Sequence, residues 1–214
     1  MQNLLIVGAG AFAREVYEHA HASIGYGTDF QIKGFLEGNI PLRPEAYGLV
    51  PMPVIASITE YEIQEDDVFI IALSDTSVKE AIAGIIDAKG GKYMNLIHKT
   101  AIVSPRAQLG KDIIICQNTT ISCDCRIGDH VMVNVCSEVG HDVEIGDFTS
   151  IMCYVDITGY VKIGTHTFWG SGSRAIPHSV IGDHVTVGAG SVILKSAHAG
   201  RTYFGVPARP VLKI

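Results

Sequence analysis

A histidine that stands between a glycine and an aspartate is a clear candidate for acid–base chemistry in this chain. The segment is Gly140-His141-Asp142. Imidazole titrates near neutral pH, so histidine is the natural side chain for taking a proton from an attacking nucleophile. A carboxylate beside the ring would stabilise the imidazolium that this transfer forms. The segment is therefore a candidate for general-base catalysis.

A glycine-rich turn near the N-terminus suggests a second kind of chemistry, which is anion binding. The turn, Gly8–Ala13, reads G-A-G-A-F-A and follows the short apolar stretch Asn3–Val7. Glycines allow a ligand to approach the backbone closely, and the helix that follows offers free N–H groups to a phosphate. Glu37, at the end of the next apolar stretch, is placed to accept hydrogen bonds from a ribose. We expect a nucleotide carried by a sugar to bind here, with glycines that serve only packing as the alternative. The expected ligand residues are Gly8, Gly10, Ala11, Phe12 and Glu37.

The first 96 residues alternate between strand and helix patterns. We predict strands over 3–7, 31–36 and 68–73 and helices over 14–22 and 78–89. This alternation is typical of a parallel α/β unit, here a small Rossmann-like one. The unit is less than half the size of a complete dinucleotide-binding domain, which argues against NAD(P).

An uninterrupted six-residue repeat fills the rest of the chain. Every sixth residue from Ile97 to Val187 is Ile, Val or Leu at fourteen of sixteen positions, with Trp169 and Ala175 as the exceptions. The residue four places later is small or β-branched, and only Ile113 exceeds three side-chain carbons. A period of six fits neither an α-helix nor a simple sheet face. It indicates three short strands per coil, so that 18 residues complete one coil of a triangular β-helix. We therefore predict two domains, 1–96 and 97–214.

Composition narrows the class of protein further. The 214 residues carry a net charge of −6 and only 18% charged residues, with a mean hydropathy of +0.27. The acidic balance and the lack of a Lys/Arg block argue against nucleic acid. No apolar run reaches the roughly 18 residues of a membrane span, and no signal peptide is evident, so we expect a cytoplasmic protein without membrane insertion. The five cysteines show no C-x-x-C spacing and are expected to be buried, reduced, small apolar residues.

Several segments together resemble the hexapeptide-repeat acyltransferases, and within them the bacterial sugar O/N-acetyltransferases. These segments are Gly8–Ala13, Asn95–Lys99, Ile102–Pro105, Val133-Asn134, Gly140–Asp142, Ile145–Phe148 and the tail Tyr203–Arg209. The resemblance covers essentially the whole chain. It implies a left-handed parallel β-helix, a homotrimer and acetyl-CoA as co-substrate, with no metal.

The resemblance also assigns roles to residues of this sequence. It makes His141 the general base, Asp142 the group that raises its basicity, and Asn134 the residue that positions the substrate amine. Positions corresponding to Gly159, Ser171 and Ala189 contact the acyl-CoA, in a groove between subunits. Ser150 stands where many members carry a second histidine that touches the acyl-CoA. Ala11 and Phe12 replace residues that often include a histidine, which leaves the acceptor open between a nucleotide-sugar and a sugar acid.

The 18-residue spacing supports this arrangement independently. Gly159 should stack one coil beyond His141 on the same edge, whereas Ser171 and Ala189 should share a different edge. His130, His166 and His184 share one row, where a metal site is possible but a solvated corner is favoured. His178, two coils beyond Asp142, is expected at the surface.

Three functions remain open at this point. The first is acetyl-CoA-dependent N-acetylation of a nucleotide-linked amino-sugar for surface glycan biosynthesis. The second is O-acetylation of a sialic-acid-like sugar. The third is a non-catalytic accessory protein that binds a sugar nucleotide. Asn134 favours the first, because an amine acceptor needs a group that orients it.

Overall fold

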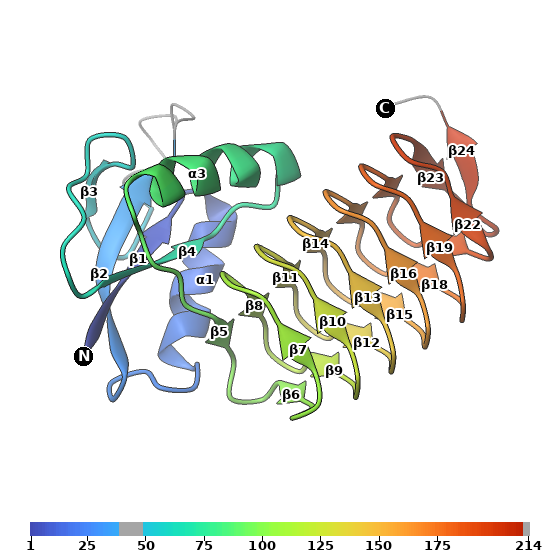
Figure 1. Cartoon of the computed structure of the whole chain (residues 1–214), viewed down its shortest axis with the longest axis horizontal. Helices are drawn as coiled ribbons and strands as arrows, with labels where there is room; N and C mark the ends of the chain where they lie inside the picture. The colour runs from blue at the N-terminus through green and yellow to red at the C-terminus, as the bar shows by residue number, and fades with distance from the viewer. Residues whose placement is uncertain (39–48, 212–214) are drawn as a thin grey trace. The chain divides into compact units, whose positions relative to one another are not determined.

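The computed structural model describes residues 1–38 and 49–211 of the chain (Figure 1). It divides into two compact units, Met1–Lys99 and Thr100–Ile214. The first unit is an α/β unit and the second is a parallel β-helix, which are the two fold classes that the sequence predicted.

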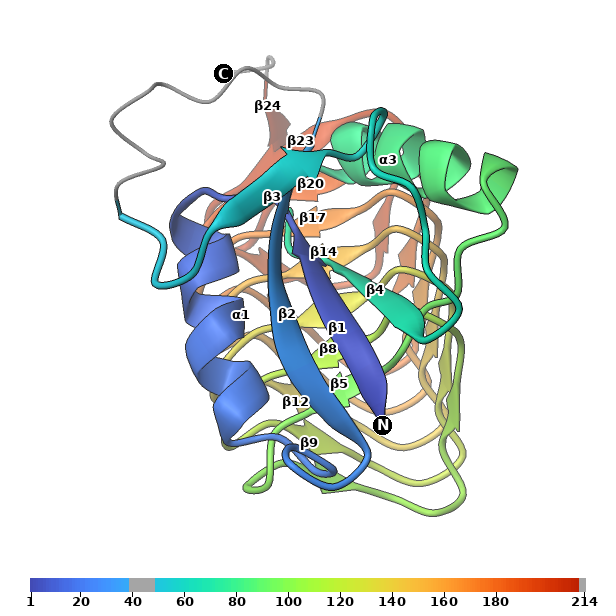
Figure 2. The same ribbon diagram turned by 90° about the vertical axis from the view of Figure 1, so that its left-hand side faces the viewer.

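The first unit is built on a four-stranded parallel sheet in the order β3-β2-β1-β4 (Figure 2). The central strand is fully buried from Leu4 to Val7. Apolar residues of the two helices cover the sheet, because each helix buries one stripe of its surface. The strands are β1 (Gln2–Val7), β2 (Phe30–Glu37), β3 (Val54–Ser57) and β4 (Asp67–Ile71), and the helices are α1 (Ala11–His21) and α3 (Thr76–Ala88).

Two features of this unit differ from the sequence prediction. Helix α1 begins at Ala11, three residues before the predicted start, because Gly10 already takes the N-cap position. The edge strand β3 was not predicted. It is four residues long, partly exposed and lacks a clear alternation of apolar and polar residues, so periodicity gives no signal for it.

The second unit is a coil of two-residue strands that pair in parallel with the strands one coil before and after. Three ladders run side by side, in the orders β7-β10-β13-β16-β19-β22, β6-β9-β12-β15-β18-β21 and β8-β11-β14-β17-β20-β23. Each pairing joins residues 18 apart, such as Val133 with Ile151. A final strand, β24, pairs antiparallel with β23.

The bounds of these strands follow the hexad without a slip. They are β5 (Leu96–Ile97), β6 (Ile102–Val103), β7 (Gln108–Leu109), β8 (Ile114–Ile115), β9 (Thr120–Ile121), β10 (Arg126–Ile127), β11 (Met132–Val133), β12 (Glu138–Val139), β13 (Glu144–Ile145), β14 (Ser150–Ile151), β15 (Asp156–Ile157), β16 (Lys162–Ile163), β17 (Phe168–Trp169), β18 (Arg174–Ala175), β19 (Val180–Ile181), β20 (Thr186–Val187), β21 (Val192–Ile193), β22 (Ser196–Ala197), β23 (Thr202–Phe204) and β24 (Arg209–Val211).

The interior of the coil holds the residues that the repeat predicted. The second residue of each strand from β8 to β21 is buried, and Trp169 is fully buried, as expected of a core residue. The small residues of the repeat also point inward. Their hydroxyl groups are satisfied by carbonyls of the next coil, because Thr119 donates to the carbonyl of Asn134 and Ser137 to that of Met152.

Each corner turns through one residue in the left-handed backbone region. This residue lies three places after the aliphatic position, and at twelve corners it is not a glycine, with φ between 55° and 62°. Glycine occupies it at residues 172 and 190. The sequence predicted a bend here but not its conformation, since bulky residues rarely adopt a positive φ.

The cysteines agree only in part with the prediction of burial. Cys116 and Cys125 are buried, but Cys123, Cys136 and Cys153 are partly exposed, because they lie at corners instead of inside the coil. All five are free thiols.

Candidate active site

His141 lies at a corner of the coil, between β12 and β13. Its Nδ1 is 2.9 Å from Oδ2 of Asp142, and the two side chains are 50% and 42% exposed. A carboxylate that accepts the Nδ1 proton leaves Nε2 as the ring atom that can take a proton from a substrate. The adjacent pair therefore has the geometry of a general base with an orienting carboxylate.

Gly159 forms the floor under the His141 ring. It lies one coil beyond, on the same edge, as the 18-residue spacing predicted, and the Tyr160 N–H donates to the His141 carbonyl at 3.0 Å. A Cβ at Gly159 would lie 2.7 Å from Nε2 and 2.8 Å from Cε1 of the ring. Only glycine therefore allows the ring its present position.

A row of side chains at one corner surrounds the pair. The row consists of Arg106, Asp124, Asp142, Tyr160 and His178, each 18 residues from the next. The ring of Tyr160 stands perpendicular to that of His141, with 4.9 Å between centroids, and His178 stacks on Tyr160 at 4.8 Å. The prediction that His178 lies at the surface is confirmed. The role of Tyr160 was missed, although its spacing from Asp142 gave the signal.

Arg106 and Asp124 form an ion pair in this row. The hydrogen bonds from the guanidinium hold the pKa of Asp124 below its usual range, and the charge of His141 acts in the same direction. Asp124 is therefore a carboxylate at working pH and is engaged by Arg106. Asp142 alone has a printed hydrogen bond to the His141 ring among the described residues.

A different edge of the coil carries three more of the predicted residues. Ser171 and Ala189 are exposed and stack directly, with the Gly190 N–H donating to the Ser171 carbonyl at 2.9 Å. Asn134, at the same edge, is 5% exposed, and its Oδ1 accepts the Val135 N–H at 2.7 Å. One chain does not bring these residues to His141, because a face of the coil separates the two edges.

Ser150 lies apart from both edges. It is the first residue of β14 and is fully buried, with a hydroxyl that has no hydrogen-bond partner in the described chain. The structure does not place this side chain where a ligand in solution would meet it.

The glycine turn closes the carboxyl end of β1. Gly8 has φ +112°, and a Cβ there would lie 3.1 Å from the Ala72 carbonyl, so this position requires glycine. Nothing lies within 4 Å of the Cβ position at Gly10. Gly10 is also the N-cap of α1 and provides no side-chain cap, and the first turn holds no acidic residue. The helix therefore presents uncapped N–H groups and open space.

Glu37 lies at the same sheet edge as this turn. Leu36 pairs with Val7, so the residues that follow them, Glu37 and Gly8, are neighbours at the carboxyl ends of β2 and β1. A pocket of about 400 Å³ lies beside α1 and includes Ala11 and Arg14. Arg14 was not predicted from the sequence, although it follows the turn by one residue.

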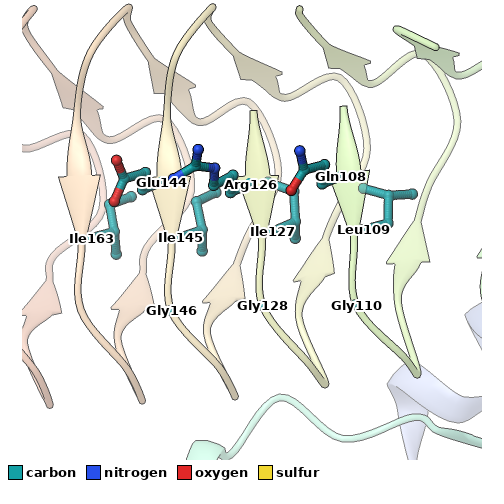
Figure 3. Close-up of a pocket in the computed structure, with 10 residues that line it drawn as sticks. All are labelled: Gln108, Leu109, Gly110, Arg126, Ile127, Gly128, Glu144, Ile145, Gly146 and Ile163. Atoms are coloured by element: carbon teal, nitrogen blue, oxygen red, sulfur yellow. The ribbon is translucent and has the colours of Figure 1, made fainter. Parts of the chain in front are cut away.

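A second pocket, of about 390 Å³, lies on the face formed by β7, β10 and β13 (Figure 3). Gln108, Arg126 and Glu144 project along these strands, and glycines without side chains open the adjoining corner. It contains none of the predicted site residues, and we assign it no ligand.

The remaining histidines form a stacked row. Phe148 lies between His130 and His166, at 4.7 and 4.9 Å, and His184 stacks on His166 at 4.8 Å. Within residues 1–38 and 49–211, no group of three or more His, Cys, Asp or Glu is arranged to hold a metal ion. In the same residues, no helix combines the length and the hydropathy needed to cross a bilayer.

Comparison with known families identifies both units. Residues 3–86 match the PglD N-terminal domain, and residues 160–195 match the bacterial transferase hexapeptide (six repeats). The acetyltransferase domain of PglB from Neisseria gonorrhoeae FA1090 is 27% identical, with a TM-score of 0.87 over 99% of this chain and 100% of that one. The chain belongs to the bacterial hexapeptide-repeat sugar acetyltransferases. It is an acyltransferase, as the sequence predicted.

Two further structures show ligands in relatives of this acetyltransferase. PerB from Caulobacter crescentus, in complex with CoA and GDP-perosamine, is 25% identical, with a TM-score of 0.87 over 99% of this chain and 98% of that one. The PglB domain was also solved with acetyl coenzyme A, at 26% identity and a TM-score of 0.87 over 98% and 99% of the two chains. The prediction of acetyl-CoA as the co-substrate agrees with these findings.

Proposed function

We propose that this acetyltransferase transfers an acetyl group from acetyl-CoA to the amine of a nucleotide-linked 4-amino-sugar, with His141 as the general base. The observation that carries the proposal is the His141–Asp142 pair, whose Nε2 lies against a glycine that leaves room for a substrate. CoA and GDP-perosamine in the PerB structure support the class of both substrates. The product would serve surface glycan assembly in the cytoplasm.

The reaction needs only groups of the protein and the two substrates. The sugar amine attacks the thioester carbonyl carbon while Nε2 of His141 accepts the amine proton. The C–S bond then breaks, the acetyl group stays on nitrogen, and the imidazolium returns the proton to the sulfur of CoA. Asp142 stabilises the imidazolium between these steps. The Gly159 N–H donates no hydrogen bond in the described part of the chain, and it would be available to the developing oxyanion.

The position of the other predicted residues suggests that the complete site needs two chains. Asn134, Ser171 and Ala189 lie on a different edge of the coil from His141. In a homotrimer, the His141 edge of one subunit would face this edge of its neighbour. The exposed, small Ser171 and Ala189 would border the groove for the pantetheine arm. The free amide NH₂ of Asn134 would face the acceptor only after a small adjustment, because the residue is 5% exposed.

The acceptor nucleotide would bind at the glycine turn of the first unit. Uncapped N–H groups at the start of α1 attract a phosphate, and open space at Gly10 lets it approach the backbone. Ala11 and Phe12 provide these N–H groups. Glu37, at the same sheet edge, would accept hydrogen bonds from the ribose. Arg14, in the adjoining pocket, adds a positive charge.

The test is a thiol-release assay with acetyl-CoA and a panel of acceptors. The panel contains GDP-perosamine, dTDP-4-amino-4,6-dideoxyglucose, the matching 4-hydroxy sugars and a sialic acid. We expect turnover of at least one amino-sugar nucleotide and none of the hydroxy sugars. Turnover of the sialic acid alone would show O-acetylation instead, and binding of nucleotide-sugar without any thiol release would indicate the accessory function.

The base is tested by His141→Ala in the same assay. We expect a fall in kcat of about 10²–10⁴-fold, the range of general-base contributions, with an unchanged trimer by light scattering. Full activity of this variant would exclude His141 as the base. Monomeric wild-type protein with full activity would exclude the shared site.

A further inference from the structure

Tyr160 and His178 lie beside the base but are not used by the mechanism above. Both occupy the corner row that includes Asp142, and each follows the previous member by one coil. The Tyr160 ring is 47% exposed, perpendicular to His141 on one side and parallel to His178 on the other. The angle between the Tyr160 and His178 rings is 4°. The three rings therefore form one continuous stack at the site.

The backbone itself does not require an aromatic residue at position 160. Tyr160 has φ 62° and His178 also has φ 62°, in the left-handed region where bulky side chains are disfavoured. Other corners satisfy the same turn with Asp112, Asn118 or Gly172. The contribution of the tyrosine ring must therefore come from what it touches.

The His141 ring has few other constraints. It is half exposed, so solvent does not fix its rotamer. Asp142 holds Nδ1, and Gly159 bounds the ring from the next coil. A single hydrogen bond at the edge of a ring still allows it to swing about that bond. The perpendicular contact with Tyr160 removes this freedom, because aromatic pairs prefer edge-to-face arrangements at centroid separations of about 4.5–7 Å.

We propose that Tyr160, backed by His178, is a positioning residue that holds the His141 ring in its productive orientation. The inference rests on the proposed function, since it concerns the orientation of the same base. His178 acts through Tyr160, because it contacts the far face of the tyrosine ring. Its backbone N–H also donates to the Gly159 carbonyl at 3.2 Å, which ties the stack to the floor of the site.

A stacked row elsewhere in the coil provides the matched control. Phe148 has φ 59° at the equivalent corner position and is stacked between two histidines, but at a different edge from His141. Tyr160→Ala and Phe148→Ala thus remove an aromatic ring from the same backbone environment. A purely structural role predicts equal effects of the two substitutions on stability and activity.

The kinetic test uses the panel acceptor with the fastest turnover and acetyl-CoA. For Tyr160→Ala we expect kcat to fall about 10- to 100-fold, because displacement of a catalytic group by about 1 Å costs up to about 10²-fold. Both KM values should stay within about twofold. Tyr160→Phe keeps the ring and should restore kcat to within about threefold, as should Phe148→Ala. His178→Ala should have a smaller effect on kcat than Tyr160→Ala.

A double variant and a spectroscopic measurement separate this inference from the function on which it rests. In a His141→Ala background, Tyr160→Ala should lower the residual rate no further, since the base it positions is gone. NMR titration of the labelled histidine ring should show that Tyr160→Ala, but not Phe148→Ala, shifts the His141 Cε1–H signal and its midpoint. This measurement needs no acceptor.

Two results would overturn the inference while leaving the base in place. One is a Tyr160→Ala kcat within twofold of wild type when His141→Ala is inactive, and the other is an unchanged His141 spectrum in Tyr160→Ala. If His141→Ala retains full activity, the proposed function fails instead.

Discussion

Gly159→Ala should inactivate the enzyme without unfolding it. The added Cβ would lie 2.7 Å from Nε2 of His141, 2.8 Å from Cε1 and 3.2 Å from Cδ2. Contacts between carbon and ring atoms are comfortable at about 3.5 Å. The ring must therefore move by roughly 0.7 Å or more. The backbone of Gly159 is outside the left-handed region, so alanine is acceptable there apart from this clash.

The expected loss follows from this displacement. A ring that moves to avoid the new methyl group lengthens the 2.9 Å hydrogen bond to Asp142 or turns Nε2 away from the acceptor. A misplacement of this size costs about 10²-fold in kcat, or about 2.7 kcal/mol of transition-state stabilisation. Stability should change little, because His141 is half exposed and its side chain can yield.

Gly140→Ala is the contrasting control in the same corner. Its Cβ would lie 2.8 Å from the Gly159 nitrogen and 2.9 Å from the Thr158 carbonyl carbon, which are backbone atoms that cannot yield. We expect this variant to lower the melting temperature, whereas Gly159→Ala should keep it within a few degrees. The assays are thiol release for kcat and thermal unfolding monitored by circular dichroism. A Gly159→Ala enzyme with kcat within twofold of wild type would refute the seat that we describe for the ring.

Three further outcomes follow from the described contacts. Asp142→Asn should lower kcat about tenfold or more, because it removes the charge that stabilises the imidazolium, and a pH–rate profile should show the loss across the neutral range. Gly10→Ala should fold normally, since nothing lies within 4 Å of its Cβ, but should raise KM for the acceptor and not for acetyl-CoA in steady-state kinetics. Asp67 is buried and hydrogen-bonded; burial raises its pKa, but Lys33, the Gln64 N–H and Tyr61 lower it on balance. A lowered pKa stabilises the fold above the unfolded-state value near 4 and not at lower pH, so Asp67→Asn should cost about 3 kcal/mol at pH 7 in urea unfolding and progressively less as the pH falls below about 4.

The β-helix was predictable from the sequence because its core is strictly periodic. A coil with 18 residues per turn can bury only the positions that recur every six residues, so aliphatic residues at those positions determine the path of the chain. Trp169 shows how firm the rule is, since even this large residue is fully buried at its place in the repeat. The stacking of Gly159 on His141 follows from the same arithmetic.

The first unit was less predictable in its details. The start of α1 and the edge strand β3 depend on a glycine N-cap and on pairing between distant residues, and neither leaves a periodic signal. The sequence identified the glycine turn correctly as the end of β1, because the type of residue there is fixed by a positive φ at Gly8.

The surroundings of the base were only partly predictable. Spacing placed Tyr160 near Asp142, but not the angle between the rings of Tyr160 and His141, which depends on side-chain torsions. Spacing also gave no warning that Ser150 would be fully buried. Contacts between corner side chains are set by three-dimensional packing, so a repeat reports which residues are neighbours but not how they meet.

The left-handed corner residues have an implication for how such a coil acquires new activities. Their conformation is fixed by the turn, while their side chains lie outside the aliphatic core, so that aspartate, tyrosine, phenylalanine and histidine all occur at this place. Exchanging one for another alters the outer surface at a chosen height along the axis and leaves the winding intact. Selectivity for a different acceptor would then require only a few substitutions in a single column, with no redesign of the interior.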